Sequence, residues 1–362
     1  MPRIIKLPIL YSISCIMQAL RPIITEETHV HDRENVLKNY ELTSKPCLWL
    51  FKHETTLDPV NLIPLWRKTA SLPDMKIVAK HFNARIEKVF GAFLKPFILN
   101  VHRPNRGEGK TEEERKRMKL ENQKKIELIK NNYLKGTHCI MMPEGTTETD
   151  GTVFPIKSGC YNLSFIEHEG STVKIPIIPV GLTYDPLSGR KHWLTGKRRN
   201  LVFINIGKPF TYEKSYDDIK QDIKHHKERV MDALIDCNTV TAAQLAGEYL
   251  IQRANEGRLG AGEAQLQKIV AARAEGLSRL EGLAFDKALL DREQRRKRVG
   301  NLYEGIQGYF ADKQNISLER VLLETSHLTY KRDNALRYCA NRLIQAAERR
   351  ADISEVLERT RD

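Results

Sequence analysis

Short apolar runs alternate with longer amphipathic stretches between about residue 45 and residue 237. Runs of this length predict strands, and stretches with apolar residues at helical spacing predict helices. The predicted strands are 47–51, 76–79, 97–101, 138–142, 174–183 and 201–206. The predicted helices are 59–68, 84–93, 111–134 and 216–236. This alternation is typical of α/β proteins, and we expect a central mixed sheet flanked by helices.

The pattern changes near residue 240, where Ala, Leu, Glu and Arg become frequent and proline no longer occurs. Thr241 and Gln244 have the spacing of a helix capping box, and Gly257 is placed to end that helix. We therefore divide a domain at 41–239 from an all-helical C-terminal domain at 240–362. Apolar residues at helical spacing give the second domain a face to bury, either against the rest of the chain or in a homo-oligomer. We expect it to serve assembly, partner binding or regulation and to supply no catalytic side chain.

The first 24 residues are mostly apolar, with Arg3, Lys6 and Arg21 around the apolar stretch. A helix over 9–20 would span roughly 18 Å at about 1.5 Å per residue, well short of a hydrocarbon core of about 30 Å. The absence of a small-residue cleavage site in the sequence argues against a cleaved signal peptide. Cationic flanks fit a segment that lies in the membrane interface, so we assign 1–40 as a membrane-associating N-terminal segment that becomes a polar loop after residue 24. A plain core-packing helix is the alternative.

The chain of 362 residues carries a net charge of +13, which favours an anionic partner such as nucleic acid, an anionic membrane surface or a phosphorylated substrate. Most of the excess positive charge lies before residue 240. The 6 cysteines are scattered without metal-ligand spacing, as in proteins of a reducing compartment. His29 and His31 form an H-x-H pair without an evident third ligand, so we expect no metal site. The sequence has no glycine-rich phosphate loop, and we expect no bound cofactor.

Polar and small residues follow or interrupt the predicted strands at four places. These are His53 to Asp58 in HETTLD, Arg103 in NVHR, Glu144, Gly145 and Thr146 in PEGTT, and Pro179 and Gly181 in IPVG. Taken alone, each place also fits a structural role: a capping box, a solvated strand end, a turn, and a bulge in an edge strand, in that order. His53 stands at a strand-to-helix turn, where loops on a rigid scaffold often carry function.

The order and spacing of these blocks resemble the signature of the glycerolipid acyltransferase family, which includes glycerol-3-phosphate and 1-acylglycerol-3-phosphate acyltransferases. The stretches DGTVFPIKSGCYNLSF and INIGKPF also look like the family's continuation, so the resemblance covers about residues 45–210. It implies that His53 is the general base toward the acceptor hydroxyl, since imidazole has an ordinary pKa of about 6.5. Asp58 would accept from the other ring nitrogen and fix the tautomer. No protein nucleophile is needed, because the acceptor alcohol attacks the thioester directly.

The resemblance gives roles to the other three blocks as well. One binds the phosphate of the acceptor, one shapes the acceptor pocket, and one lies near the acyl donor. A guanidinium suits phosphate because it binds two oxygens at once. The matching residues are Arg103 for the first, Glu144, Gly145 and Thr146 for the second, and Pro179 and Gly181 for the third.

Thr147 departs from the family pattern, because many members that use phosphate-bearing acceptors have arginine after E-G-T. One expected phosphate contact is therefore missing, and members that acylate other lysophospholipids also lack this arginine. Arg106 and Lys157 are cations in the same region that are available to compensate.

We expect a membrane-associated O-acyltransferase on the cytoplasmic face, with acyl-CoA or acyl-carrier protein as the donor and a lysophospholipid as the acceptor. The favoured acceptor is 1-acylglycerol-3-phosphate, which would give phosphatidic acid. Glycerol-3-phosphate or another lysophospholipid is the alternative acceptor. A non-catalytic basic protein that binds anionic lipid or nucleic acid through its helical tail is the rival from another class. The intact His53 and Asp58 favour the enzyme, and we expect no nucleic-acid partner.

Overall fold

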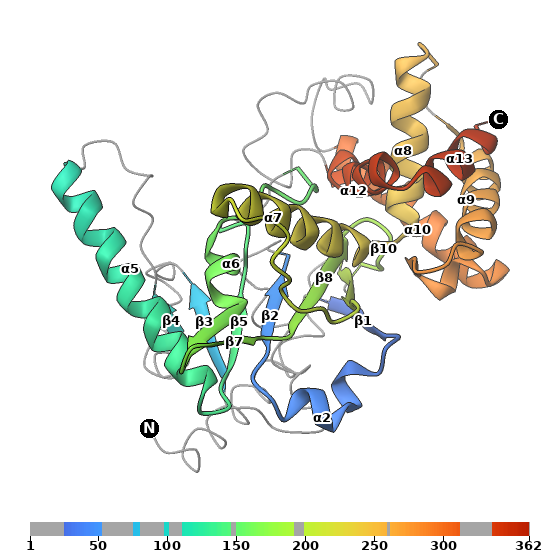
Figure 1. The fold of residues 1–362 in the computed structure, drawn as a ribbon. Coiled ribbons are helices and arrows are strands. Elements are labelled where there is room, and N and C mark those ends of the chain that lie inside the picture. Colours follow the sequence, from blue (N-terminus) through green and yellow to red (C-terminus); the bar gives the residue numbers. More distant parts are fainter. Residues whose placement is uncertain are drawn as a thin grey trace.

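The fold is built on a mixed sheet of 7 strands in the order β1-β9-β8-β2-β5-β3-β4 (Figure 1). The computed structural model describes residues 25–52, 75–79, 98–100, 111–145, 150–191, 199–258, 261–311 and 335–361. The N-terminal segment before residue 25 and the helices expected at 59–68 and 84–93 lie outside the described residues. The strands are β1 (Thr25–Asp32), β2 (Leu48–Phe51), β3 (Met75–Ala79), β4 (Ile98–Asn100), β5 (His138–Met141), β8 (Ile177–Asp185) and β9 (Asn200–Ile206).

Strand β1 corrects one expectation, because residues 25–32 were expected to form a polar loop. They instead form an edge strand that pairs in parallel with β9, from Thr25 with Asn200 to Asp32 with Ile206. The strand lies at the edge of the sheet, and most of its side chains are half-buried. Polar residues are therefore compatible with a strand at this position.

The predicted strand 174–183 is divided at a proline. Ser171–Lys174 forms β7, which pairs with β6 (Phe165–His168) in a separate antiparallel hairpin, and β8 begins only at Ile177. Pro176 lies between them and has no N–H for a ladder. Strand β8 is interior to the sheet, between β9 and β2, so the alternative interpretation of Pro179 and Gly181 as a bulge in an edge strand was wrong. Pro179 is tolerated there because it precedes the first pair of β8 with β9, which is Val180 with Ile206.

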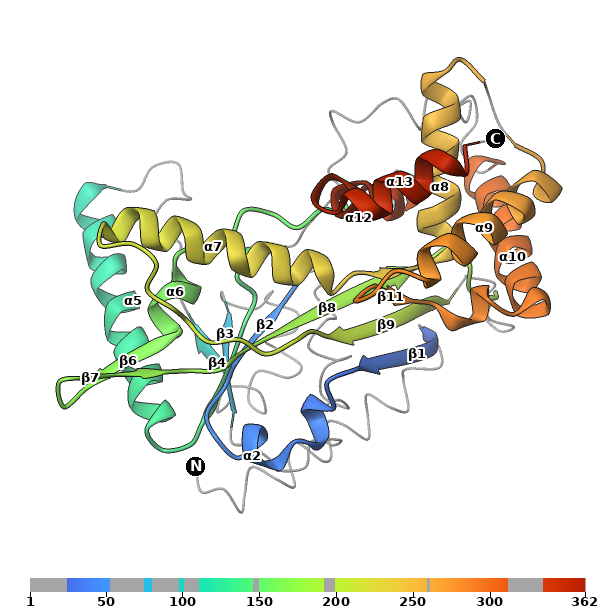
Figure 2. The ribbon, with the colours of Figure 1, turned by 45° about the vertical axis from the view of Figure 1, so that its right-hand side comes forward.

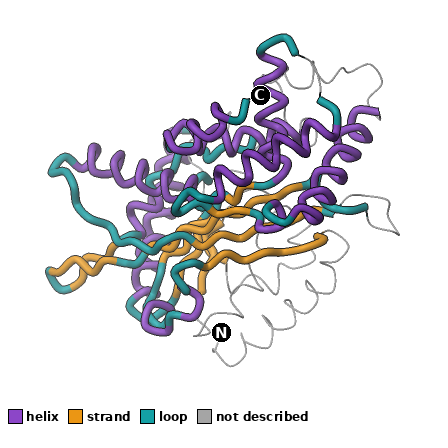
Figure 3. Tube along the Cα trace, turned by 90° about the vertical axis from the view of Figure 1, so that its right-hand side faces the viewer, coloured by secondary structure: helices purple, strands orange, loops and turns teal. Residues whose placement is uncertain are grey.

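Alternate residues of the central strands enter two different hydrophobic clusters. Leu48 and Leu50 of β2 face the helices α5 (Glu112–Tyr133), α6 (Gly159–Leu163) and α7 (Ile219–Asp236). Trp49 and Phe51 face the opposite side, where the 3-10 turn Val36–Lys38 and α2 (Tyr40–Thr43) lie. In Figure 3 most of the described helices lie on one side of the strands. The predicted helices 111–134 and 216–236 are thus confirmed as the cover of one face of the sheet.

The C-terminal part is mainly helical, as expected, and it packs on the sheet domain rather than standing apart from it (Figure 2). One small correction applies, because β10 (Thr239–Val240) and β11 (Ala284–Phe285) form a short parallel pair. The hydrophobic cluster on the α7 face continues into this part without a break. The helices are α8 (Ala242–Asn255), α9 (Glu263–Ser278), α10 (Arg292–Ala311), α12 (Ala335–Arg349) and α13 (Ala351–Arg359), with a 3-10 turn at Lys287–Leu289.

Helix α8 begins and ends as its sequence predicts. The amide of Gln244 donates to Oγ1 of Thr241 at 3.4 Å, and Gly257 follows the helix with a φ of 72°. The second half of the capping box is absent, since the Gln244 side chain exchanges hydrogen bonds with Asn238 instead. The cap therefore also anchors the helix to the preceding turn.

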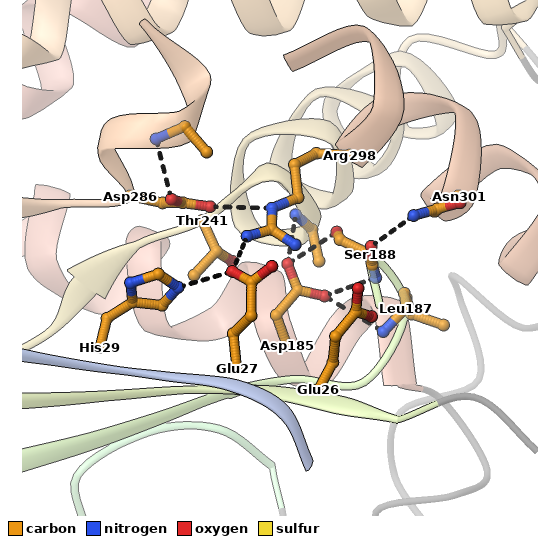
Figure 4. Close-up of polar contacts among 12 residues, drawn as sticks. Glu26, Glu27, His29, Asp185, Leu187, Ser188, Thr241, Asp286, Arg298 and Asn301 are labelled. Atoms are coloured by element: carbon orange, nitrogen blue, oxygen red, sulfur yellow. Dashed lines mark hydrogen bonds and ion pairs between the residues drawn. The ribbon is translucent and has the colours of Figure 1, made fainter. Parts of the chain in front are cut away.

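Buried charges join the helical part to the edge of the sheet (Figure 4). Arg298 of α10 donates to Glu27 of β1 at 2.6 Å, and its Nε lies 3.5 Å from the carboxylate of Asp286. Burial raises the pKa of Asp286 above its ordinary value, although Arg298 acts in the opposite direction. Nearby, Asn301 donates to the carbonyl of Ser188 at 3.2 Å. These contacts fix α10 against β1 and the end of β8.

Candidate active site

The first three sequence blocks follow strands whose carboxyl ends lie at one edge of the sheet. Strands β2, β5, β3 and β4 are neighbours and run parallel. Their last pairs are level with one another: Leu50 with Met141, Met141 with Val78, and Ala79 with Asn100. In α/β sheets, ligands bind at the carboxyl ends of such strands. This edge is therefore the candidate site.

Four of the predicted site residues lie outside the described residues. They are His53, Asp58, Arg103 and Thr146. The described chain reaches Lys52 after β2, Asn100 in β4 and Gly145 after β5. The segments that carry the four residues in sequence thus start from the same edge, and the roles of these residues stay predictions.

Lys52 is a buried cation at this edge that the sequence analysis did not single out. It is 4% exposed, and its Nζ donates to the carbonyl oxygen of Gly151 at 2.7 Å. Lysine is almost never fully buried without a partner. A lysine at the end of an apolar run, directly before His53, was therefore a signal in the sequence that a polar partner lies at this edge. The bond connects the end of β2 with the segment that follows β5.

Glu144 is fully buried just beyond β5. Its Oε2 accepts a hydrogen bond from the amide of Phe154 at 2.8 Å. Gly145 has a φ of 65°, and its amide donates to the carbonyl of Met142 at 3.0 Å in a tight turn. Glycine adopts this left-handed conformation without strain. The alternative interpretation of Glu144 and Gly145 as a turn is therefore correct. This turn places the buried carboxylate of Glu144 at the candidate site.

Pro179 and Gly181 lie on the face of β8 that meets the chain just after α7. A Cβ atom on Gly181 would lie 2.1 Å from the carbonyl oxygen of Cys237, so no larger residue fits without a shift of backbone. The carbonyl of Pro179 accepts a hydrogen bond from the amide of Gly207 at 2.9 Å. Close packing therefore accounts for Gly181, whether or not it also lies near a substrate.

Buried cysteines offer no reactive thiolate near the sheet. Burial raises the pKa of Cys47, Cys139, Cys160 and Cys237 to about 12 in each case. A thiol with such a pKa stays protonated at neutral pH and is a poor nucleophile.

A cavity of about 660 Å³ lies between the end of β9, the end of α7 and the end of α12. Charged side chains of both signs line it, including Lys208, Asp232, Asp236 and Arg349. An acyl chain requires an apolar lining, so this cavity does not suit the fatty acyl group.

The H-x-H pair of β1 packs against an aromatic ring. The rings of His29 and His31 stack on Phe203 with centroid distances of 5.0 and 6.4 Å, and His29 also bonds to Glu27 at 2.9 Å. Burial, followed by the charges of His29 and Arg33, lowers the pKa of His31 to about 4. Within the described ranges, no group of three or more His, Cys, Asp or Glu side chains is placed to hold a metal ion.

Comparison with known proteins identifies the class of this domain. Residues 27–183 match the Acyltransferase family. This match covers less than half of the chain and supports the family resemblance that the four sequence blocks indicated. No curated protein matches the chain.

One solved structure that resembles the chain is the crystal structure of the 1-acyl-sn-glycerophosphate acyltransferase PlsC from Thermotoga maritima. The TM-score is 0.36 and the sequence identity 16%, over 62% of this chain and 79% of that one. Among the helices that the structure describes, none has the length and apolar character needed to cross a bilayer.

Proposed function

We propose that this protein is a glycerolipid O-acyltransferase that moves a fatty acyl group from acyl-CoA or acyl-carrier protein to the hydroxyl of a lysophospholipid. The carrying observation is the common edge at which β2, β4 and β5 end, because the first three family blocks follow these strands in sequence. The match of residues 27–183 to the Acyltransferase family supports the reaction class.

His53 is proposed as the general base. Its ring nitrogen takes the proton of the acceptor hydroxyl while that oxygen attacks the thioester carbonyl. The tetrahedral intermediate then collapses, the carbon–sulfur bond breaks, and the imidazolium returns the proton to the departing thiolate. Asp58 accepts from the second ring nitrogen, which orients the ring and stabilises its charged form.

The favoured acceptor is 1-acylglycerol-3-phosphate, with phosphatidic acid as the product. Arg103 is the proposed phosphate ligand, while Glu144, Gly145 and Thr146 shape the pocket. Lys157 supports a phosphate-bearing acceptor, because it is exposed and its Cγ would lie 3.4 Å from a Cβ on Gly145. The aliphatic part of a cationic side chain therefore lies beside Gly145 of the third block even though Thr147 replaces the common arginine.

Thr147 also keeps a second acceptor class open, namely another lysophospholipid or glycerol-3-phosphate. Pro179 and Gly181 are proposed to border the donor site, and the donor carries negative charge in both forms. The net charge of +13 favours such a donor and an anionic membrane surface on the cytoplasmic face. The apolar part of the N-terminal segment, residues 1–24, is the proposed membrane anchor, since residues 25–32 belong to the sheet.

The decisive experiment supplies the purified full-length protein with acyl-CoA or with acylated acyl-carrier protein and, in separate reactions, with each of several lysophospholipids and glycerol-3-phosphate. Lipid mass spectrometry identifies the acylated product. We expect phosphatidic acid from 1-acylglycerol-3-phosphate, in a reaction that His53→Ala slows strongly. Transfer to another acceptor alone would replace the favoured substrate. If neither donor gave transfer to any acceptor, the enzyme assignment would be refuted.

A further inference from the structure

Helix α12 of the C-terminal part lies directly on the segment that follows the third block. This segment is defined as residues 150–154 and is called the block-3 segment. Asn341 donates to the carbonyl of Asp150 at 2.8 Å. Gln345 makes a paired contact with Val153, because its Oε1 accepts from the Val153 amide at 2.7 Å and its Nε2 donates to the Val153 carbonyl at 3.1 Å.

Gly151 is shaped for this contact. Its φ is 96°, a conformation that favours glycine, and a Cβ atom there would lie 1.9 Å from the carbonyl oxygen of Tyr338 in α12. From the sheet, Lys52 bonds to the carbonyl of the same glycine at 2.7 Å. The block-3 segment is therefore held on one side by β2 and on the other by α12.

Phe154, the last residue of the block-3 segment, bonds to Glu144 of the third block. Phe154 donates its amide to the buried carboxylate of Glu144, and the adjacent Val153 is held by Gln345. Displacement of Val153 would therefore move the partner of Glu144. The side chain of Gln345 is thus connected to Glu144 through the backbone of two adjacent residues, Val153 and Phe154.

We propose that Gln345 is a positioning residue of the acyltransferase site, which holds the block-3 segment so that Glu144 keeps its place in the acceptor pocket. This inference rests on the proposed function. Residue 345 lies outside the part of the chain that matches the family, residues 27–183. The helical part therefore takes a share in building the site, in addition to any role in assembly or regulation, while still supplying no group that touches the reacting atoms.

The test compares Gln345→Met with Arg349→Gln in the full-length protein. Methionine keeps the length of the side chain but makes neither backbone hydrogen bond. Arg349 lies one turn further along α12, and its partly exposed ion pair with Asp232 at 3.3 Å does not involve the block-3 segment. We expect Gln345→Met to raise the KM for the acceptor about tenfold or more while the KM for the donor stays within about twofold, since small misplacements in a site have large effects. Arg349→Gln should leave both values unchanged.

A merely structural role would lower the active fraction, and so reduce kcat while both KM values stayed the same. An unchanged acceptor KM in folded Gln345→Met would therefore overturn the proposal. If Gln345→Met does not fold, Asn341→Ala replaces it, since it removes only the bond to Asp150 and should give a smaller rise of the same kind. An unchanged acceptor KM in that variant would then overturn the proposal.

Amide hydrogen exchange separates this inference from the proposed function. We expect exchange in peptides covering 150–156 to be faster in Gln345→Met than in Arg349→Gln, with no difference in peptides from β2. If the wild-type protein transfers no acyl group, the proposed function fails, and the exchange result alone decides whether Gln345 holds the segment. Equal exchange in the two variants would overturn that contact.

Discussion

Lys52 donates a hydrogen bond to the carbonyl oxygen of Gly151 at 2.7 Å, and both residues are buried. Lys52 directly precedes the first family block, and Gly151 follows the third, so this one bond links the two segments on which the proposed chemistry depends. A buried ammonium needs such a partner because burial without one is costly. The bond therefore holds the segments after β2 and β5 together in the protein interior next to the candidate site.

Replacement of the proposed base should remove most of the activity. We expect His53→Ala to lower kcat by about 10²–10⁴-fold, which is the usual contribution of a positioned general base. His168→Ala is the matched control, because His168 is exposed on the β6–β7 hairpin. Rates of thioester consumption with the acceptor present check this, and wild-type turnover in His53→Ala would make His53 structural.

Arg103 should act on the acceptor rather than on the donor. We expect Arg103→Ala to raise the KM for a phosphate-bearing acceptor and to leave the donor KM nearly unchanged. Arg103→Lys should recover only part of the loss, because an ammonium cannot bind two phosphate oxygens in the same planar geometry. Steady-state kinetics with a neutral acceptor provide the control, and an equal loss with that acceptor would contradict phosphate recognition.

The central elements could be predicted from the sequence because their burial leaves a local pattern. All of Leu48–Phe51 and Ile177–Asp185 are buried, so β2 and β8 appear as apolar runs. The start of helix α5 is marked by a complete capping box of Thr111 and Glu114. The spacing of the four blocks then indicated the family, and the match of residues 27–183 to the Acyltransferase family supports it.

The features that the sequence concealed depend on contacts between distant residues. Strand β1 carries polar residues along much of its length and forms because β9 pairs with it. The contact of Gln345 with Val153 joins residues separated by 192 positions, and no local pattern reports it. Gly151 was the one local trace of that contact, but a lone glycine after an acidic residue reads as an ordinary turn.

Gly181 should be intolerant of even one methyl group. Gly181→Ala would place a Cβ atom 2.1 Å from the carbonyl oxygen of Cys237, a backbone atom that cannot rotate away. We expect a loss of about 1–3 kcal/mol in the free energy of unfolding, as for other overpacked sites. Gly300→Ala in α10 is the control, since its nearest contact is 3.5 Å away and alanine favours helices by about 1 kcal/mol over glycine. Urea unfolding of the two variants should therefore shift in opposite directions.

Removal of the N-terminal segment should weaken membrane binding. Deletion of residues 1–24 removes the apolar stretch and its flanking cations, each of which contributes about 1 kcal/mol near an anionic surface. We expect cosedimentation with vesicles that contain phosphatidylserine to fall sharply, and binding of the intact protein to weaken as salt is added. Undiminished binding of the truncated protein would move the anchor to another part of the chain.

His226 should make the protein less stable in mild acid. This histidine is 3% exposed on α7, its Nε2 lies 3.0 Å from Oγ of Ser164, and burial, assisted by Arg229, lowers its pKa to about 4. An unfolded histidine has a pKa of about 6.5, so between these values the unfolded chain binds more protons than the folded one. Stability is therefore complete above the unfolded pKa and is lost as the pH falls from about 6.5 toward 4.

The contribution of His226 can be isolated with a pair of variants on the same helix. Linkage gives a loss of about 2 kcal/mol from this one side chain between pH 7 and pH 5, since each pKa unit corresponds to about 1.4 kcal/mol. His226→Gln keeps a hydrogen-bonding group for Ser164 but cannot take up the proton, so the difference between its unfolding free energies at the two pH values should shrink by that amount. Lys224→Gln, which alters an exposed side chain of the same helix, should keep the wild-type difference. His31, whose pKa is also lowered to about 4 by burial, should account for part of the acid sensitivity that His226→Gln retains. Urea titrations at pH 7 and pH 5 measure these differences, and an unchanged pH dependence in His226→Gln would show that the buried imidazole does not resist protonation in the folded protein.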